Sequence, residues 1–349
     1  MKKTIKFVAL FAAAALAFGA APAATAANAT KACLALDTGG VDDRSFNQAA
    51  WDGAKKIKSS TISVEYLPAA SSADFAPNIK KFVDNKCTVI IGVGFAISGA
   101  IVASAKANPS INYAVVDDAG LDCNADYSVC NPVKNVKGLT FSTDQTSFMA
   151  GYLAAGVSKS GKVATYGGAP YPTVTIFMDG FAKGVAHYNK IKGKSVQVLG
   201  WDPAKKTGEF IGDFQNMTKA LQVSKNFEQA GADIIFPVAG NLASATAQNS
   251  LSSKKSVVIW VDKDGVLAAP QFKSVILTSV VKGVGEAVYS AIKDSNAGTF
   301  NNASYVGTLA NGGTRLAAYH NLIRRVPTAL RTEVVKLGTS IRSGKVSVK

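Results

Sequence analysis

The chain has 349 residues, which is long enough for two domains of ordinary size. Hydrophobic residues make up 48% of it and charged residues 17%, a balance that excludes a disordered protein. Only two histidines are present, which argues against a His-rich metal centre, and the formal charge of +15 raises the question of nucleic-acid binding.

Residues 1–26 have the pattern of a secretory signal peptide. Three lysines precede an apolar run over residues 7–18, and small residues follow up to Ala26. We expect cleavage near Ala26 and an exported protein, periplasmic or extracytoplasmic and soluble; the alternative is an N-terminal membrane anchor. The segment before Cys33 lacks the Leu-small-small run of a lipid-attachment site, and no later apolar stretch is long enough for a transmembrane helix.

After this segment, strand-like and helix-like runs alternate along the chain. Short apolar runs predict strands over residues 33–37, 64–67, 89–93, 113–116, 136–141, 162–166, 196–199, 234–238, 257–261 and from 275. Periodic runs predict helices over residues 45–58, 75–83, 146–158, 174–188, 210–230, 242–251 and up to 292. This alternation is typical of parallel sheets covered by helices on both faces.

The repetition occurs in two sets, which predicts two doubly wound lobes. We expect the first lobe to comprise residues 27–142, completed by about 280–349, and the second to comprise residues 143–279.

Four cysteines in an exported protein predict two disulfides. Cys123 and Cys130 flank a polar loop that they could close, and Cys33 and Cys87 each stand just before a predicted strand. Neighbouring parallel strands would bring the second pair together. The alternative is four buried free thiols; zinc is disfavoured because no C-x-x-C spacing occurs.

Polar residues and glycines follow several of the predicted strands. Asp37 and Asp117 come after strands of the first lobe, and Gly240 and Asp262 after strands of the second. Ligands of parallel α/β sheets bind beyond the carboxyl ends of the strands, so a cleft between the lobes is expected. Each Asp alone could be a helix cap and each Gly a tight turn; their recurrence in both lobes favours a ligand site.

The residue types indicate a neutral ligand with a ring and a diol. Carboxylates can accept two hydrogen bonds from a vicinal diol, and Phe46 and Phe236 offer flat faces to a ring. Lys282 is a cation in an apolar stretch. The alternatives are core packing for the two rings and a solvated helix position for the lysine. No P-loop or G-x-G-x-x-G occurs, so a nucleoside or sugar fits better than an anion or a dinucleotide.

These residues lie in segments that resemble the basic membrane protein family, the purine nucleoside receptor A type of ABC transporter substrate-binding proteins. The resemblance covers essentially the whole chain after residue 26. Its segments are residues 37–53 (DTGGVDDRSFNQAAWDG), 90–95, 115–117, 141–152, 180–184, 237–240, 261–264 and 277–282.

The resemblance implies an α/β type I periplasmic-binding-protein fold with two lobes, a hinge and a nucleoside between them. Carried over by position, the resemblance implies that Asp37 and Asn47 hydrogen-bond the base, with Asp117 beside them, and that Phe46 and Phe236 stack on the base. It implies that Asp262, Lys282 and the backbone of Gly240 hold the ribose hydroxyls. Phe177 would form a further wall of the site.

We therefore expect a monomeric binding protein that delivers a purine nucleoside (inosine, guanosine or adenosine) to an ABC transporter permease. No catalytic residue, cofactor or metal is expected. A binding protein for a free sugar or other small polar ligand, or a ligand sensor, remains open as an alternative. A nucleoside-acting enzyme lacks a matching acid/base or metal motif, and a DNA-binding regulator would lack the signal peptide.

The positive charge gathers late in the chain. Without the signal-peptide lysines the formal charge falls to +12, and residues 315–349 hold eight Lys and Arg against one acid, Glu333. This segment does not show the alternation of basic and aromatic residues that is typical of a nucleic-acid groove. We interpret this segment as a solvated face, open to attraction by anionic lipid or by the permease.

Overall fold

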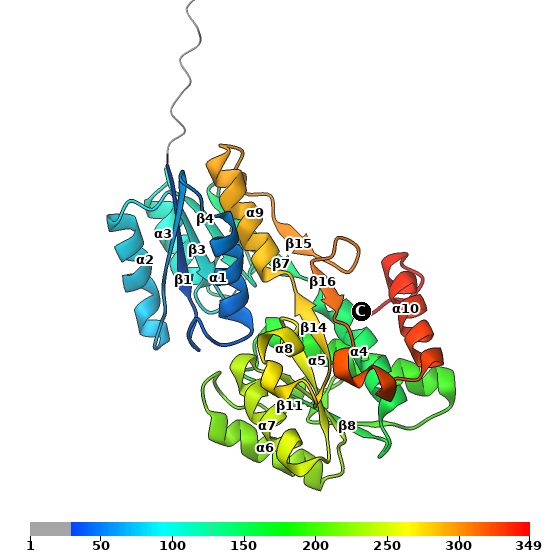
Figure 1. Cartoon of the computed structure of the whole chain (residues 1–349). Coiled ribbons are helices and arrows are strands. Elements are labelled where there is room, and N and C mark those ends of the chain that lie inside the picture. Colours follow the sequence, from blue (N-terminus) through cyan, green and yellow to red (C-terminus); the bar gives the residue numbers. More distant parts are fainter. Residues whose placement is uncertain (1–28, 127) are drawn as a thin grey trace, which may run out of the picture.

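Two α/β lobes make up the part of the chain that the computed structural model describes, residues 29–126 and 128–349 (Figure 1). The expected signal peptide, residues 1–26, lies outside these ranges. None of the helices within them combines the length and apolarity needed to cross a membrane.

The first lobe is a six-stranded parallel sheet in the order β15-β7-β4-β3-β1-β2. Helices α1 and α9 cover one face, and α2 and α3 cover the other (Figure 1). The elements are β1 (Thr30–Leu36), α1 (Phe46–Ile57), β2 (Ile62–Leu67), α2 (Phe75–Asp84), β3 (Val89–Val93), α3 (Ser98–Ala107), β4 (Asn112–Val116), β7 (Val136–Phe141), α9 (Val284–Asn296) and β15 (Tyr305–Gly307).

The second lobe is a six-stranded sheet in the order β16-β14-β13-β12-β8-β9, parallel except for β16. Helices α4, α5 and α10 cover one face, and α6, α7 and α8 cover the other. The elements are α4 (Thr143–Val157), β8 (Lys162–Gly167), α5 (Pro172–Lys192), β9 (Gln197–Leu199), α6 (Met217–Gln229), β12 (Ile234–Val238), α7 (Ala243–Ser253), β13 (Val257–Asp262), α8 (Gly265–Ala268), β14 (Ile276–Lys282), β16 (Thr314–Leu316) and α10 (Thr328–Arg342).

Two short hairpins complete the described strands. They are β5 (Leu121–Cys123) with β6 (Cys130–Pro132) in the first lobe, and β10 (Trp201–Asp202) with β11 (Thr207–Gly208) in the second.

Burial on both faces explains the apolar runs from which the strands were predicted. In β1, Leu34 and Leu36 pack toward α1 and α9, whereas Cys33 and Ala35 pack toward α2 and α3. All four side chains are fully buried. Alternate residues of a strand point to opposite faces, so a strand covered on both sides must be apolar throughout.

The chain passes between the lobes at three places: after β7, after β14, and between β15 and β16. The three connections are hydrogen-bonded to one another, with the N–H of Ser142 donating to the carbonyl of Gly307 (2.8 Å) and that of Gly283 to Gly313 (2.8 Å). A Cβ on Gly313 would lie 2.3 Å from the Cα of Gly307, so this close approach requires glycine. The hinge thus consists of three connecting segments whose backbones are in direct contact.

The C-terminal residues divide between the lobes, which corrects the expectation that residues 280–349 complete the first lobe. Helix α9 and strand β15 do join the first lobe, but β16 pairs with β14 and α10 packs on the second lobe. Helix α10 packs on the second lobe because its apolar stripe contacts the α4 and α5 side of the second core. The stripe is formed by Leu330, Val334, Leu337 and Ile341.

One helix is shorter than predicted. The periodic segment at residues 210–230 forms a helix only from Met217, where Asn216 caps α6 by accepting a hydrogen bond from the N–H of Lys219 (2.9 Å). The preceding residues form a loop, and the backbone of Glu209 and Ile211 bonds to Gly167 at the end of β8 instead. This loop therefore lies beside the carboxyl end of the second sheet.

Both expected disulfides are present. Cys33 on β1 bonds to Cys87, which precedes the neighbouring strand β3, and Cys123 bonds to Cys130 across the β5–β6 hairpin. The first joins residues 54 positions apart and the second joins residues 7 positions apart.

The two disulfides should differ in their contribution to stability. The entropy lost by the unfolded chain grows with the loop closed, which gives about 4 kcal/mol for the first and about 2 kcal/mol for the second. Replacing both partners by alanine, one pair at a time, and measuring urea unfolding should show the larger loss for Cys33→Ala/Cys87→Ala. An equal or larger loss for Cys123→Ala/Cys130→Ala would contradict this ranking.

Candidate functional site

A cavity lies where the carboxyl ends of the two sheets face each other. Both lobes contribute to its wall, mainly through residues at or just after strand ends. These are Asp37, Gly94 and Asp117 after β1, β3 and β4, and Gly240, Asp262 and Lys282 at β12, β13 and β14.

Eight of the nine binding residues predicted from the sequence line this cavity. They are Asp37, Phe46, Asn47, Asp117, Phe177, Gly240, Asp262 and Lys282.

The ninth, Phe236, does not line the cavity. Its side chain is fully buried in the second core, with its ring centroid 5.2 Å from that of Phe181 and 6.3 Å from that of Phe177. Phe236 lies two residues before the end of β12, under α5, and the next residue on that side of the strand, Val238, is the one that reaches the cavity. The predicted stacking of Phe236 on a ligand ring is therefore wrong.

Three aromatic residues outside the predicted set of binding residues form a ring cluster on the cavity wall. The Tyr171 ring centroid lies 5.6 Å from that of Phe95 and 6.2 Å from that of Phe214. Phe95 follows β3, so the strand-end rule could have selected it. Tyr171 immediately precedes the Pro172 that opens α5, and Phe214 lies in a loop at residues for which the sequence predicts a helix.

Asp37 and Asn47 are two residues of the first lobe that bring hydrogen-bond acceptors to the cavity wall. The Asn47 amide nitrogen donates to the carbonyls of Asp37 (3.3 Å) and Thr38 (3.4 Å), which directs its oxygen away from them. That oxygen is buried and has no hydrogen-bond partner among the residues that the structure describes. A Cβ on Gly94 would lie 2.4 Å from the Asp37 carboxylate, so glycine leaves room for this side chain.

The Asp37 carboxyl is partly buried close to the ring cluster. Burial raises the pKa of Asp37, and the N–H of Thr38, 2.7 Å from the carboxylate, acts in the opposite direction. Burial also raises the pKa of Tyr171, and the nearby charge of Asp37 adds to this effect. The two side chains therefore face the same part of the cavity from opposite lobes.

Lys282 is a buried cation that joins the two lobes. Its ammonium lies 2.7 Å from the Asp117 carboxylate of the first lobe and 3.7 Å from the Asp262 carboxylate of the second. It also lies 4.7 Å from the ring centroid of Phe46 and 5.3 Å from that of Phe177, within cation–π range. The lysine side chain is only 4% exposed.

Asp117 and Asp262 both adopt a left-handed backbone conformation, with φ of 68° and 64°. This region costs an L-residue roughly 1–2 kcal/mol, and such strain gathers at binding sites. Here the backbone turn at each strand end directs a carboxylate toward Lys282.

The start of α1 is held by a buried carboxylate. Asp43 accepts hydrogen bonds from the N–H groups of Ser45 (2.9 Å), Asn47 (2.8 Å) and Gln48 (3.0 Å). Burial raises the pKa of Asp43 to about 6, although these three bonds act to lower it. The Ser45 hydroxyl then donates across the lobes to the Asp262 carboxylate at 2.6 Å.

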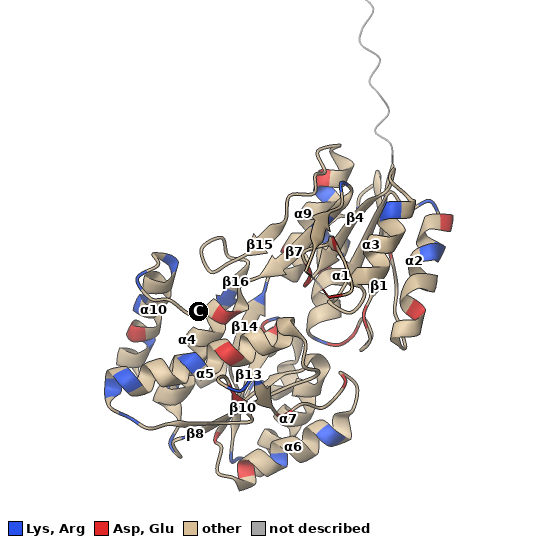
Figure 2. Cartoon of the chain, turned by 180° about the vertical axis from the view of Figure 1, so that it is seen from behind, with Lys and Arg blue, Asp and Glu red and all other residues tan. Residues whose placement is uncertain are grey.

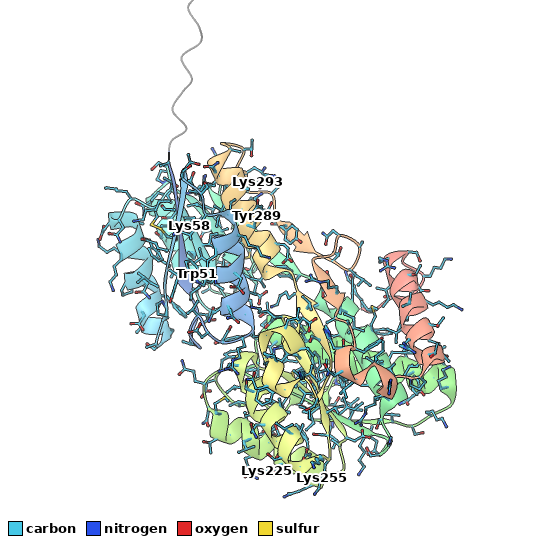
Figure 3. The ribbon with its side chains drawn as sticks, in the orientation of Figure 1. Trp51, Lys58, Lys225, Lys255, Tyr289 and Lys293 are labelled. Carbon is cyan, nitrogen blue, oxygen red and sulfur yellow. A yellow bond between two sulfur atoms is a disulfide. The ribbon has the colours of Figure 1, made fainter. Side chains whose placement is uncertain are left out.

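The site is acidic, whereas the basic excess of the chain lies elsewhere. Lys and Arg residues gather along α10 on the far side of the second lobe (Figure 2). Lys225 and Lys255 lie at the end of that lobe remote from the first (Figure 3). The cavity therefore offers acceptors, aromatic faces and one paired cation.

One group of residues in the described chain has metal-ligand spacing, and it is not in this cavity. Cys33, Cys87 and Glu65 lie together, but the two sulfur atoms form the disulfide and are not free thiolates.

Comparison with known families identifies relatives over nearly the whole chain. A family model described as "ABC transporter substrate-binding protein PnrA-like" (Bmp) matches residues 30–314. The "ABC transporter nucleoside-binding protein BmpA" of Lactococcus lactis is 28% identical, covering 91% of this chain and 88% of that protein. A "CD4+ T-cell-stimulating antigen" of Listeria monocytogenes is 31% identical over 76% of this chain and 74% of that protein.

Solved structures share the fold. An ABC transporter solute-binding protein from Aeropyrum pernix superposes with a TM-score of 0.78 at 21% identity, covering 91% of this chain and 92% of that chain. A periplasmic solute-binding protein from Actinobacillus succinogenes with bound D-allose has a TM-score of 0.59 at 17% identity, covering 83% and 98%. These likenesses confirm the periplasmic-binding-protein fold expected from the sequence.

The different positions of the two phenylalanines predict different effects on stability. Phe236→Ala should destabilise the ligand-free protein by about 3–5 kcal/mol, because it leaves a cavity in a packed core. Phe46→Ala should cost clearly less, because that ring is only partly buried at the cavity wall. Urea unfolding of both variants measures this, and a larger loss for Phe46→Ala would contradict the placement of the two rings.

Proposed function

Because the chain belongs to the Bmp family of PnrA-like ABC transporter substrate-binding proteins, we propose that its ligand is a purine nucleoside, bound between the lobes and delivered to a membrane permease. Members of the family bind solutes for ABC transporters and are not enzymes. The name of the Lactococcus relative, a nucleoside-binding protein, supports the choice of ligand.

The observation that carries the proposal is the unpaired amide oxygen of Asn47. A buried acceptor without a partner costs about 1–3 kcal/mol, and a ligand N–H would remove that cost. The Asn47 amide donates to the backbone carbonyl of Asp37, and the side chain of Asp37 lines the same cavity, so this end suits the hydrogen-bonding edge of a base. The rings of Phe95, Tyr171 and Phe214 offer apolar faces on the same side.

The other end of the cavity suits a ribose. The Asp262 carboxylate and the Lys282 ammonium supply acceptors and donors for vicinal hydroxyls. At Gly240, φ is +55° and no atom lies within 4 Å of where a Cβ would be, so its backbone is accessible there. We assign Phe46 and Phe177 to the walls between the two ends, and Asp117 to holding Lys282 in place.

Purified protein should bind at least one of inosine, guanosine and adenosine in isothermal titration calorimetry. Phe46→Ala should weaken binding at least tenfold, because stacking and cation–π contact contribute about 1.5 kcal/mol or more. Tyr289→Ala is the matched control, since this exposed ring on α9 of the same lobe lies outside the cavity (Figure 3). Binding of ribose or another sugar, with none of any nucleoside, would refute the purine proposal.

Nucleotides should be rejected. Among the described residues, the cavity wall holds four carboxyl groups and one cation, Lys282, which is already paired; the carboxyl groups are those of Asp37, Asp43, Asp117 and Asp262. Burying a phosphate there would leave its charge uncompensated. Inosine 5′-monophosphate should bind at least a hundredfold more weakly than inosine, which is about 2.7 kcal/mol. Equal affinities would show that a further cation reaches the ligand.

A further inference from the structure

Another ion pair joins the lobes outside the cavity, and it is shorter and less exposed than the pair of Arg315 with Glu286 (3.9 Å). The ammonium of Lys263, just after β13 in the second lobe, lies 2.6 Å from the Asp52 carboxylate and 3.1 Å from the Gln48 side-chain oxygen. Both partners are on α1 of the first lobe. None of these three residues lines the ligand cavity.

We propose that Lys263 and Asp52 form a latch that holds the lobes together and so lengthens the time a ligand stays bound, without touching the ligand. We use the word latch for this pair, with Gln48 as its second acceptor.

The local backbone directs Lys263 toward the first lobe. Asp262 turns the chain with its left-handed φ of 64°, and the N–H of Lys263 donates to the carbonyl of Val261 at 2.7 Å. The next residue, Asp264, bonds back into its own lobe, to the N–H of Val266 at 3.1 Å and to His320 at 2.7 Å. Thus Asp262 lines the cavity, Lys263 contacts the first lobe, and Asp264 contacts the second lobe, to which all three residues belong.

Both ends of the latch are firmly anchored. On α1, a Cβ at Gly53 would lie 2.1 Å from the carbonyl oxygen of Gly285, so α1 and α9 are in backbone contact next to Asp52. On the second lobe, His320 holds Asp264 beside the lysine. Because Asp52 and Lys263 are each held by contacts within their own lobe, we expect the pair to break when the lobes separate.

The latch is better shielded than an ordinary surface pair. The side chains of Lys263 and Asp52 are 23% and 33% exposed. By comparison, Lys55, which also bonds to Asp52 (2.9 Å) but within α1, is 51% exposed. When the lobes separate, Asp52 keeps Lys55, whereas both side-chain hydrogen bonds of Lys263 found in the described chain are to α1. On opening, Lys263 therefore loses both of these hydrogen bonds, whereas Asp52 keeps its ion pair with Lys55.

Neutral variants of similar shape test the latch. Lys263→Met and Asp52→Asn should each raise the dissociation rate of inosine roughly three- to tenfold, with little change in association, because a shielded ion pair is lost only on opening. The double variant should be no faster than the faster single variant. Lys55→Met is the matched control and should not speed dissociation. Stopped-flow tryptophan fluorescence gives these rates.

The latch proposal rests on the proposed function only for the choice of inosine as the probe. A distance measurement tests the latch independently of that function. Spin labels at exposed Lys58 and Lys255, which lie on different lobes (Figure 3), report lobe separation with and without inosine. Lys263→Met should shift the distribution to longer distances, and Lys55→Met should not.

The outcomes are distinct. If inosine does not bind the unaltered protein, the proposed function fails and the label distances alone decide on the latch. Unchanged distances and rates in Lys263→Met, or additive effects of Lys263→Met and Asp52→Asn, would overturn the latch.

Discussion

The arrangement of the site depends on one buried charge, the ammonium of Lys282. An unpaired charge at this depth would cost several kcal/mol, so the lysine must have partners. One partner, Asp117, belongs to the first lobe, and the other, Asp262, belongs to the second. The nearer partner, Asp117 at 2.7 Å, is within reach only when the lobes approach, which couples the electrostatics of the cavity to the relative position of the two sheets.

The topology explains how a single lysine can do this. Lys282 is the last residue of β14, directly before the chain passes from the second lobe to α9 of the first. Its strand is flanked by β13, which ends in Asp262, and by β16, which returns the chain to the second lobe. The hinge, the cavity and the inter-lobe pair therefore share one short stretch of backbone.

The positions of the site residues could be predicted because parallel sheets present their carboxyl ends at one edge. The rule succeeded for Asp37, Asp117 and Asp262, since each immediately follows or ends a strand buried on both faces. It failed for Phe236, which lies within its strand, where alternation and not strand-end position decides the direction of a side chain. Tyr171 lies in a loop, where sequence periodicity carries no information on direction.

The C-terminal segment shows a similar limit. No helix is predicted there from the sequence, and the apolar stripe of α10 does not tell which of two similar lobes it packs against. The three-residue strands β15 and β16 decide the path, and they are too short to stand out from a loop in the sequence. Their pairings, to different sheets, follow only from the tertiary structure.

A crystal structure of the protein with inosine tests the central claim most directly, namely that one nucleoside spans two chemically distinct ends of this cavity. The account predicts the base edge within hydrogen-bond distance of Asp37 and of the Asn47 amide oxygen, and the ribose hydroxyls at Asp262 and Lys282. A nucleoside bound in the reverse direction, or outside the cavity, would contradict it.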